Sequence, residues 1–314
     1  MKTRQITTEI TPKELEFYRN WVLHNIADAK MDIDRRGYQL IQWPATIWNS
    51  QEKPNELSLE HEARLKPSND KGLSRLRNKL YRLEGKVLDD LILSKEPNLN
   101  NLILRRYLRP SGFQSIDHYF DFDDLTFTKK MFTIRQRIKT SPFMTWSATT
   151  SELFAINLEM PFMIYKNSKI SIRLEFNWLG EISRCWNEAF IEYEDNTVSK
   201  SPFNILWQNN LIFPGNLQPV IEHTTFREKF GVYKKDGEDY REVFVINIDQ
   251  VVAQSLSSKR FGTYVDVDIS SVNLIENDII TDLEMFVNAF SSEFDLKLND
   301  ETKVYRDASI LEMI

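Results

Sequence analysis

The sequence of 314 residues is poor in the residue types that build many phosphate and metal sites: it has 9 Gly, 1 Cys and 4 His. The single cysteine, Cys185, excludes a disulfide framework and a cysteine-based zinc cluster within one chain. The sequence contains no glycine-rich phosphate loop, no GxSxG turn and no HExxH zinc motif. Phosphate or metal bound by this chain must therefore be held by side chains of other types.

Long apolar segments are also absent. No stretch approaches the roughly 18 apolar residues that a membrane-spanning helix needs, and the first residues do not resemble a signal peptide. Together with the single thiol, these absences predict a cytoplasmic protein that does not enter a membrane.

The net charge of −6 hides an uneven distribution of charge along the chain. Residues 60–109 and 129–139 are rich in Lys and Arg, whereas residues 261–301 are rich in Asp and Glu. The acidic total disfavours non-specific binding to DNA. The separated signs indicate basic and acidic segments that face one another in the fold, although each run alone is also compatible with a solvated surface.

Two regions differ in pattern from the rest of the chain. Residues 1–55 are predicted to form a helical appendage at the N-terminus, because Thr11-Pro12-Lys13-Glu14 combines a helix N-cap, a proline in the first turn and a capping box. Residues 181–220 are polar and irregular, and they are predicted to be an insertion.

Alternation of apolar and polar residues dominates the remaining sequence. This pattern predicts strands over Leu57–Lys66, Phe132–Lys139, Ile170–Asn177, His223–Tyr233, Arg241–Asp249 and Thr263–Ile269. Helical spacing of apolar residues predicts one helix over Leu73–Leu91 and another that includes Ile279–Phe290. Many strands with few helices predict an antiparallel α+β fold.

The polar faces of these strands carry charges of one sign. A like-charged stripe costs free energy unless opposite charge lies across from it. An antiparallel β-barrel with a charged lumen meets this requirement, because its apolar faces then turn outward against flanking helices. Basic residues in such a tunnel would bind a polyanion, and paired carboxylates would bind Mg²⁺ or Mn²⁺.

Short charged motifs occur on these segments in a definite order. They are Glu60-x-Glu62-x-Arg64, Tyr119-Phe120-Asp121, Arg135-x-Arg137, Arg173-x-Glu175, Arg227-x-Lys229, Asp266-x-Asp268 and Thr302-Lys303-Val304-Tyr305. Their order resembles that of the CYTH superfamily, the triphosphate tunnel metalloenzymes. The resemblance implies a single tunnel domain over residues 56–314, interrupted by the insertion.

The resemblance also implies roles for individual side chains. The implied metal ligands are Glu60, Glu62, Asp266 and Asp268. The implied phosphate-binding residues are Arg64, Lys66, Arg135, Arg137, Arg173, Arg227 and Lys303. The implied catalytic residues are Glu60, Glu62 and Glu175, with Glu175 positioning the attacking water. The implied cofactor is Mg²⁺ or Mn²⁺.

The function implied is that of a metal-dependent triphosphatase. Its substrate would be a nucleoside triphosphate, inorganic triphosphate or the 5′ triphosphate end of an RNA. Two alternatives use the same scaffold: a tunnel-type adenylyl cyclase, and a non-catalytic nucleotide or polyphosphate sensor. The sensor is motivated by departures from the family pattern at Phe122, Asn177 and Val245.

A further alternative is a structural or interaction protein whose charges face solvent. In that case Arg135 and Arg137 would pair with Asp123 or Asp124. Each of these alternatives is compatible with a homo-oligomer.

Overall fold

The computed structural model describes residues 56–88, 99, 101–107, 113–129, 132–140, 151–160, 171–179, 218–271, 277–299 and 301–314. For some strand residues, among them Glu60, Arg173 and Glu175, it describes the backbone alone. The predicted appendage and Cys185 lie outside the described residues, as does the predicted insertion up to residue 217. Residues 218–220 belong to a strand.

Ten strands form one sheet in which every pairing is antiparallel. They are β1 (Glu56–Pro67), β2 (Leu102–Arg106), β3 (Phe113–Asp121), β4 (Phe132–Thr140), β5 (Ser151–Met160), β6 (Ser171–Leu179), β7 (Gln218–Asp236), β8 (Asp239–Ser255), β9 (Phe261–Ser271) and β10 (Leu296–Leu298). All six predicted strands are present. They coincide with β1, β4, β6, β7, β8 and β9.

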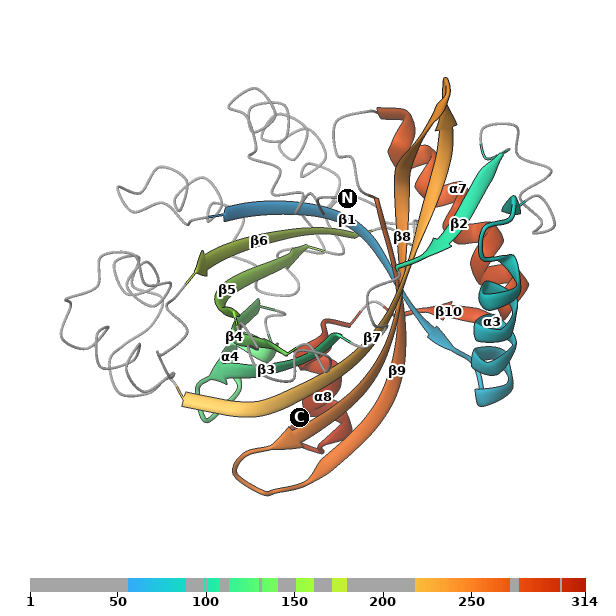
Figure 1. Ribbon diagram of the computed structural model, residues 1–314. Helices are drawn as coiled ribbons and strands as arrows, with labels where there is room; N and C mark the ends of the chain where they lie inside the picture. Colours follow the sequence, from blue (N-terminus) through green and yellow to red (C-terminus); the bar gives the residue numbers. More distant parts are fainter. Residues whose placement is uncertain are drawn as a thin grey trace, which may run out of the picture.

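The sheet curves round on itself in the order β10-β1-β6-β5-β4-β3-β7-β8-β9, as Figure 1 shows. The strand β1 pairs with β6 over Glu56–Glu62 and with β9 over Glu62–Leu65. The result is an antiparallel α+β fold of barrel-like shape, as the sequence predicts. The term barrel is approximate, because only four residues of β1 join it to β9.

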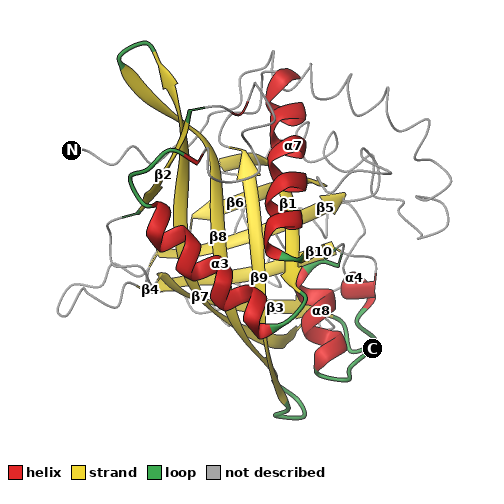
Figure 2. Cartoon of the chain, turned by 90° about the vertical axis from the view of Figure 1, so that its right-hand side faces the viewer, coloured by secondary structure: helices red, strands yellow, loops and turns green. Residues whose placement is uncertain are grey.

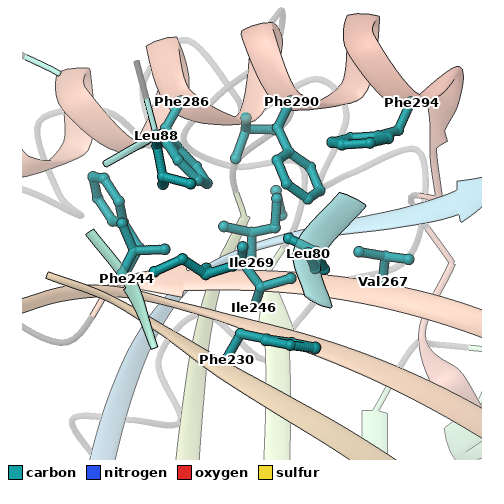
Figure 3. Packing of buried hydrophobic residues seen from close by; sticks show 14 of the residues in the cluster. Leu80, Leu88, Phe230, Phe244, Ile246, Val267, Ile269, Phe286, Phe290 and Phe294 are labelled. Carbon is teal, nitrogen blue, oxygen red and sulfur yellow. The ribbon is translucent and has the colours of Figure 1, made fainter. Parts of the chain in front are cut away.

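Two helices, α3 (Asp70–Leu83) and α7 (Asn277–Phe294), cover the outer face of the sheet (Figure 2). Between them and the sheet lies the main hydrophobic core, which includes Phe230 and Ile246. Phe286, Phe290 and Phe294 follow one another at four-residue spacing along α7, with ring centroids 5.6 and 4.8 Å apart (Figure 3). The apolar strand faces are thus turned outward, which leaves the polar faces for the interior.

The helix α3 is shorter than its leucine pattern predicts. It ends at Leu83, because Glu84 adopts an extended conformation and Gly85 has a φ of 73°, a left-handed value that favours glycine. The chain then forms a bridge from Glu84 to Leu104 of β2. Leu88 is nevertheless buried in the core, so the apolar spacing continues past the end of the helix.

Two short helices lie near the other end of the sheet: α4 (Thr126–Lys129) and α8 (Lys303–Ile310). The N-cap of α8 is Thr302, whose hydroxyl accepts a hydrogen bond from the backbone N–H of Tyr305. Val304 and Ala308 of α8 pack in a second apolar cluster with residues of β3, β7 and β8. In the described part of the chain, no helix is both long and apolar enough to cross a membrane.

Candidate functional site

Six charged side chains from four strands and one helix meet on the inner face of the sheet. We call them the central charged cluster: Glu62, Arg64, Arg227, Asp249, Asp268 and Lys303. The strand register brings them together, since Arg64 lies opposite Asp268 and Arg227 lies opposite Asp249. Alternation along each strand places the charged residues inside and their apolar neighbours in the outer core.

Lys303, the first residue of α8, links two strands of the cluster. Its Nζ donates hydrogen bonds of 2.8 Å to Oδ2 of Asp249 on β8 and of 2.8 Å to Oδ2 of Asp268 on β9. Both carboxylates and the ammonium group are buried. Burying an ammonium group is costly unless it is paired, so the two carboxylates hold Lys303 in its charged form.

Arg227 contacts the same two carboxylates from β7. Its Nε and Nη2 donate hydrogen bonds of 2.6 Å to Oδ1 and 2.6 Å to Oδ2 of Asp249, which is the two-point geometry that suits a guanidinium group. Its Nη2 also lies 3.7 Å from Oδ2 of Asp268. The Arg227 side chain is 31% exposed, whereas Asp249 is fully buried, so Arg227 connects the cluster to solvent.

Arg64 connects the cluster to β1. Its Nη2 donates a 3.2 Å hydrogen bond to Oε1 of Glu62, and its Nε lies 3.7 Å from Oδ1 of Asp268. Its Nη1 donates a 2.9 Å hydrogen bond to the carbonyl oxygen of Glu301, which directly precedes the N-cap of α8. Arg64 therefore fixes both an acidic pair and the start of the helix that supplies Lys303.

Opposing effects set the protonation of the two aspartates. Burial raises the pKa of Asp268 to about 7; Lys303 opposes the shift, while the Glu62 and Asp249 carboxylates add to it. Burial acts in the same direction on Asp249, but Arg227 and Lys303 outweigh it and hold the pKa of Asp249 well below its usual range. Asp249 is thus the firm counter-ion of the cluster, and Asp268 is the carboxylate that a proton or a cation can neutralise.

A second group of polar side chains anchors α8 deeper in the interior. His223 Nδ1 lies 2.6 Å from Oδ2 of Asp307, and the hydroxyl of Tyr264 donates a 2.7 Å hydrogen bond to Oδ1 of the same carboxylate. The Arg306 guanidinium stacks 4.0 Å from the centre of the Tyr264 ring and also bonds to Asp266. These contacts fix α8 in place and thereby position Lys303.

Arg135 and Arg137 of β4 lie in the same interior but bind a different carboxylate. Arg137 donates hydrogen bonds of 2.6 and 2.5 Å to the two oxygens of Asp117 on β3, and Arg135 Nη1 lies 3.6 Å from Asp117 Oδ2. The suggested pairing with Asp123 or Asp124 is wrong: Asp123 accepts from Gln218 and Asp124 from Thr126. The reason is the β3–β4 register, which puts Asp117 opposite Arg137 and leaves the other two aspartates in the turn after β3.

The structure brings together several of the residues that the sequence singled out. Glu62, Arg64, Arg227, Asp268 and Lys303 are in the central charged cluster, and Asp266 lies beside it on β9. The side chains of Glu60, Arg173 and Glu175 are not among those described. In backbone register, Glu60 lies opposite Arg173, and Glu175 lies opposite Ser58.

Lys66 differs from the other predicted phosphate-binding residues. It lies past the segment of β1 that faces β9, and its register partner is Lys297 of β10. Among the described residues, no ion pair joins it to the central charged cluster. Its role in phosphate binding remains a prediction.

Sequence reasoning missed three interior carboxylates and their partners. They are Asp117, Asp249 and Asp307. The alternation of polar and apolar residues could have placed Asp249 in the interior, because it lies two residues after Asn247 and therefore on the same inner face of β8. Asp307 had no such signal, because it stands beside the apolar residues Val304 and Ala308 of α8, and the sequence does not show that this side of the helix also meets polar side chains.

Two buried carboxylate oxygens of β9 accept no hydrogen bond from the described residues: Oδ2 of Asp266 and Oδ1 of Asp268. Carboxylate oxygens are the donors that Mg²⁺ and Mn²⁺ prefer. Within the described ranges, however, no three His, Cys, Asp or Glu side chains are grouped to hold a metal ion. These two oxygens are the candidate protein ligands of a divalent cation in the described part of the chain, and a Mg²⁺ ion held by so few carboxylates would complete its coordination with other oxygen donors such as water.

Comparisons with known proteins found neither a matching family model nor a matching curated protein. Solved structures that match this chain include a proposed adenylate cyclase of Bacillus halodurans, at 14% identity and a TM-score of 0.44, covering 80% of this chain and 97% of that one. A proposed adenylyl cyclase from Hippeastrum, described as having a dominant triphosphatase activity, matches at 10% identity with a TM-score of 0.41. The match covers 79% of this chain and 96% of that one. The capping enzyme triphosphatase of Mimivirus matches at 12% identity with a TM-score of 0.33, covering 80% of this chain and 93% of that one.

Proposed function

We propose that the central charged cluster binds the triphosphate group of a substrate, and that the protein hydrolyses this group with the help of a divalent cation. One observation carries the proposal: Arg64, Arg227 and Lys303 converge on the carboxylates of Asp249 and Asp268 inside the sheet. Charges buried in this way contribute little net stability. Perturbed, buried ionisable groups of this kind occur most often at functional sites.

The arrangement of charges suits an exchange of partners. The oxygens of a triphosphate compete with Asp249 and Asp268 for the guanidinium groups and the ammonium group, which bind phosphate well. A divalent cation that arrives with the substrate would take the released carboxylates. Each buried charge then keeps a partner in both states, which avoids the cost of an unpaired buried ion.

The cation would be held by Asp266 and Asp268, each of which has a buried carboxylate oxygen that accepts no hydrogen bond from the described side chains. When bound, it would neutralise the charge that develops on the phosphate oxygens. Glu60 and Glu62 remain predicted ligands on β1. In the described structure the Glu62 carboxylate is bonded to Arg64, so it would have to move or share this contact.

The remaining interior residues support positioning rather than covalent chemistry. Phosphoryl transfer to water depends mainly on holding the phosphate chain and stabilising its charge. Arg135 and Arg137 offer two further guanidinium groups to the terminal phosphates, at the cost of their contacts with Asp117. Glu175 is the proposed carboxylate that positions the attacking water, and Arg173 the proposed phosphate contact on β6.

The direct test is incubation of the purified protein with Mg²⁺ or Mn²⁺ and a panel of inorganic triphosphate, nucleoside triphosphates and an RNA with a 5′ triphosphate. Release of orthophosphate is expected from at least one substrate. Arg227→Ala should reduce the rate at least tenfold, since it removes two charged hydrogen bonds. Arg82→Ala, which removes an arginine exposed on α3, is the matched control and should leave the rate unchanged.

Other outcomes would replace hydrolysis by a different function of the same site. Pyrophosphate and a cyclic nucleotide as products would identify a cyclase. Tight binding of triphosphate without any turnover would identify a sensor. If no triphosphate binds or reacts, the proposed function is wrong.

A further inference from the structure

The inner face of β7 continues past the central charged cluster. Glu228 forms a 2.8 Å ion pair with Arg77 of α3, and Phe230 is buried in the core beneath the helices. The even-numbered residues of this segment therefore face the helices. By the alternation of a strand, Arg227 and Lys229 share the opposite face, which leads away from the cluster toward the far end of β7.

Here β7 changes its neighbour. Its pairing with β3 ends at Arg227, and β2 pairs with the same strand from Phe230 to Lys234. On the other edge, β8 continues without interruption apart from one register shift after Val232. Three strands thus extend the inner surface beyond the ring of the sheet, as β2, β7 and β8 in Figure 1 show.

Cationic and aromatic side chains alternate on this extension. The guanidinium carbon of Arg105 lies 5.4 Å from the ring centre of Tyr233 and 5.2 Å from that of Tyr240. The Nζ of Lys229 lies 4.5 Å from the ring centre of Tyr107. We call these five residues the basic–aromatic strip. All three contacts lie within the range of cation–π attraction.

Two of the three rings of the strip, those of Tyr107 and Tyr233, are held by hydrogen bonds. The Tyr107 hydroxyl donates a hydrogen bond to the Glu242 carboxylate, which also interacts with the Tyr233 hydroxyl. Gly231 makes room for this arrangement, because a Cβ at this position would lie 2.7 Å from the Tyr233 ring. Glu242 is an acidic residue beside the strip, and its carboxylate interacts with two tyrosine hydroxyls.

Part of the strip is open to solvent. Tyr240 is 39% exposed and Arg105 is also exposed, while Tyr107, Lys229 and Tyr233 are half-buried. The strip therefore offers rings and cations to a ligand without any rearrangement of the strands. Its inner end adjoins Arg227, the partly exposed member of the cluster.

We propose that the basic–aromatic strip binds a single-stranded polynucleotide. Aromatic rings stack with bases, while the arginine and lysine neutralise phosphates, and this combination is how proteins bind single strands without reading sequence. An acidic protein segment would use the cations but has no need of ordered rings. The net charge of −6 belongs to the whole chain; within the strip the charged residues are the cations Arg105 and Lys229, and the adjoining Glu242 carboxylate is already bonded to Tyr107.

A polynucleotide bound along the strip would have one end beside the central charged cluster. This part of the inference rests on the proposed function, and it makes the triphosphate end of a polynucleotide the natural occupant of both sites. Binding to the strip itself is independent of hydrolysis, so the two can be tested separately.

The test is fluorescence anisotropy of the full chain with labelled RNA and DNA single strands of about 12 nucleotides that carry a 5′ hydroxyl, within the site sizes of known single-strand binders. Both strands are expected to bind, and added salt should weaken binding. Tyr240→Ala and Arg105→Ala should each weaken binding at least fivefold, given the stacking contribution of one base. Tyr240→Trp should retain it.

Two matched controls distinguish the strip from general surface charge. Phe261→Ala removes an exposed aromatic residue, and Arg82→Ala removes an exposed arginine, both outside the strip; neither should change oligonucleotide binding. Thermal unfolding of each variant verifies that the fold is retained. Polyglutamate of equal charge should compete poorly, because it cannot stack on the rings.

The proposal is overturned if neither strand binds, if polyglutamate competes as well as RNA, or if Tyr240→Ala and Arg105→Ala bind like the unmodified protein. None of these results would contradict the proposed hydrolysis of inorganic triphosphate. Conversely, oligonucleotide binding without any binding or hydrolysis of triphosphate would retain the strip and refute the proposed function. Preference for RNA over DNA would show that 2′-hydroxyl groups are recognised as well.

Discussion

Asp117 of β3 lies directly opposite Arg137 of β4, and its two carboxylate oxygens accept hydrogen bonds of 2.6 and 2.5 Å from one guanidinium group. The carboxylate is fully buried. Burial alone would raise its pKa, but Arg137 and Arg135 outweigh burial and hold the pKa of Asp117 well below its usual range. The pair is therefore ionised at neutral pH.

The first prediction concerns stability in acid. Because the pKa of Asp117 is lowered on folding, its charge stabilises the folded state above the unfolded pKa of about 3.9, and this contribution is lost as pH falls below that value. Asp117→Asn should lower the free energy of unfolding by about 2 kcal/mol at pH 7. The difference from the unmodified protein should shrink below about pH 4. Urea denaturation at several pH values measures it, and a difference independent of pH would contradict the assignment.

The second prediction concerns the ammonium group between two carboxylates. Lys303→Met removes the ammonium group that donates hydrogen bonds to both Asp249 and Asp268, and it should destabilise the fold by about 3–5 kcal/mol, the usual effect of breaking a buried ion pair. Adding Asp268→Asn should restore part of the loss, since one buried charge is then removed. Urea denaturation of both variants gives the comparison. A single variant as stable as the unmodified protein would show that Lys303 does not neutralise this pair.

The third prediction separates geometry from charge at Arg227. Arg227→Lys keeps the positive charge but loses the two-point contact that a guanidinium group makes with a phosphate or carboxylate. Affinity for inorganic triphosphate, measured by calorimetry, should fall by about tenfold or more. Arg82→Lys on the outside of α3 is the matched control. Equal affinities for Arg227→Lys and the unmodified protein would mean that charge alone is needed at this position.

The fourth prediction uses the close contact between β9 and α8. A Cβ added at Gly262 would overlap Cγ2 of Ile310, so Gly262→Ala should displace α8 and cost about 1–3 kcal/mol of stability, as overpacking usually does. The displacement would also move Lys303 and weaken triphosphate binding. Combining the substitution with Ile310→Ala removes the overlap and should restore both properties. Failure of this rescue would show that the cost arises in the backbone of β9.

The sequence predicted which residues face the interior better than it predicted their partners. Charges at every second position of β1 and β9 sufficed to place Arg64 and Asp268 on the polar faces of their strands, because a strand has a strict period of two, whereas Arg227 was identified from the order of motifs. The partner of Arg137 was missed, because register depends on how a turn pairs two strands and alternation does not contain that information. Val245, one of the departures from the family pattern, lies opposite Gly231 of β7 and Ser270 of β9.

The end of α3 and the interior contacts of α8 are two further features that the sequence pattern does not predict. The leucine spacing continued past Leu83 because Leu88 enters the same core from a segment outside the helix. Periodicity alone cannot distinguish a buried leucine of a helix from a buried leucine of the segment that follows it. Beyond Lys303, the interior role of α8 was missed, because the position of Asp307 beside Val304 and Ala308 does not show which polar side chains it meets. Only the three-dimensional arrangement shows that Asp307 anchors α8 through His223 and Tyr264.

The pairing of β1 with β9 has a consequence for how quickly the protein reaches its working form. Arg64 and Asp268 face each other across strands that are roughly 200 residues apart in the chain, and such non-local pairings are formed slowly, often in milliseconds to seconds. The charged pair therefore assembles only when the two distant strands meet. Until then, β1 and β9 each present an unpaired edge to other chains, and during synthesis these edges are where self-association would begin.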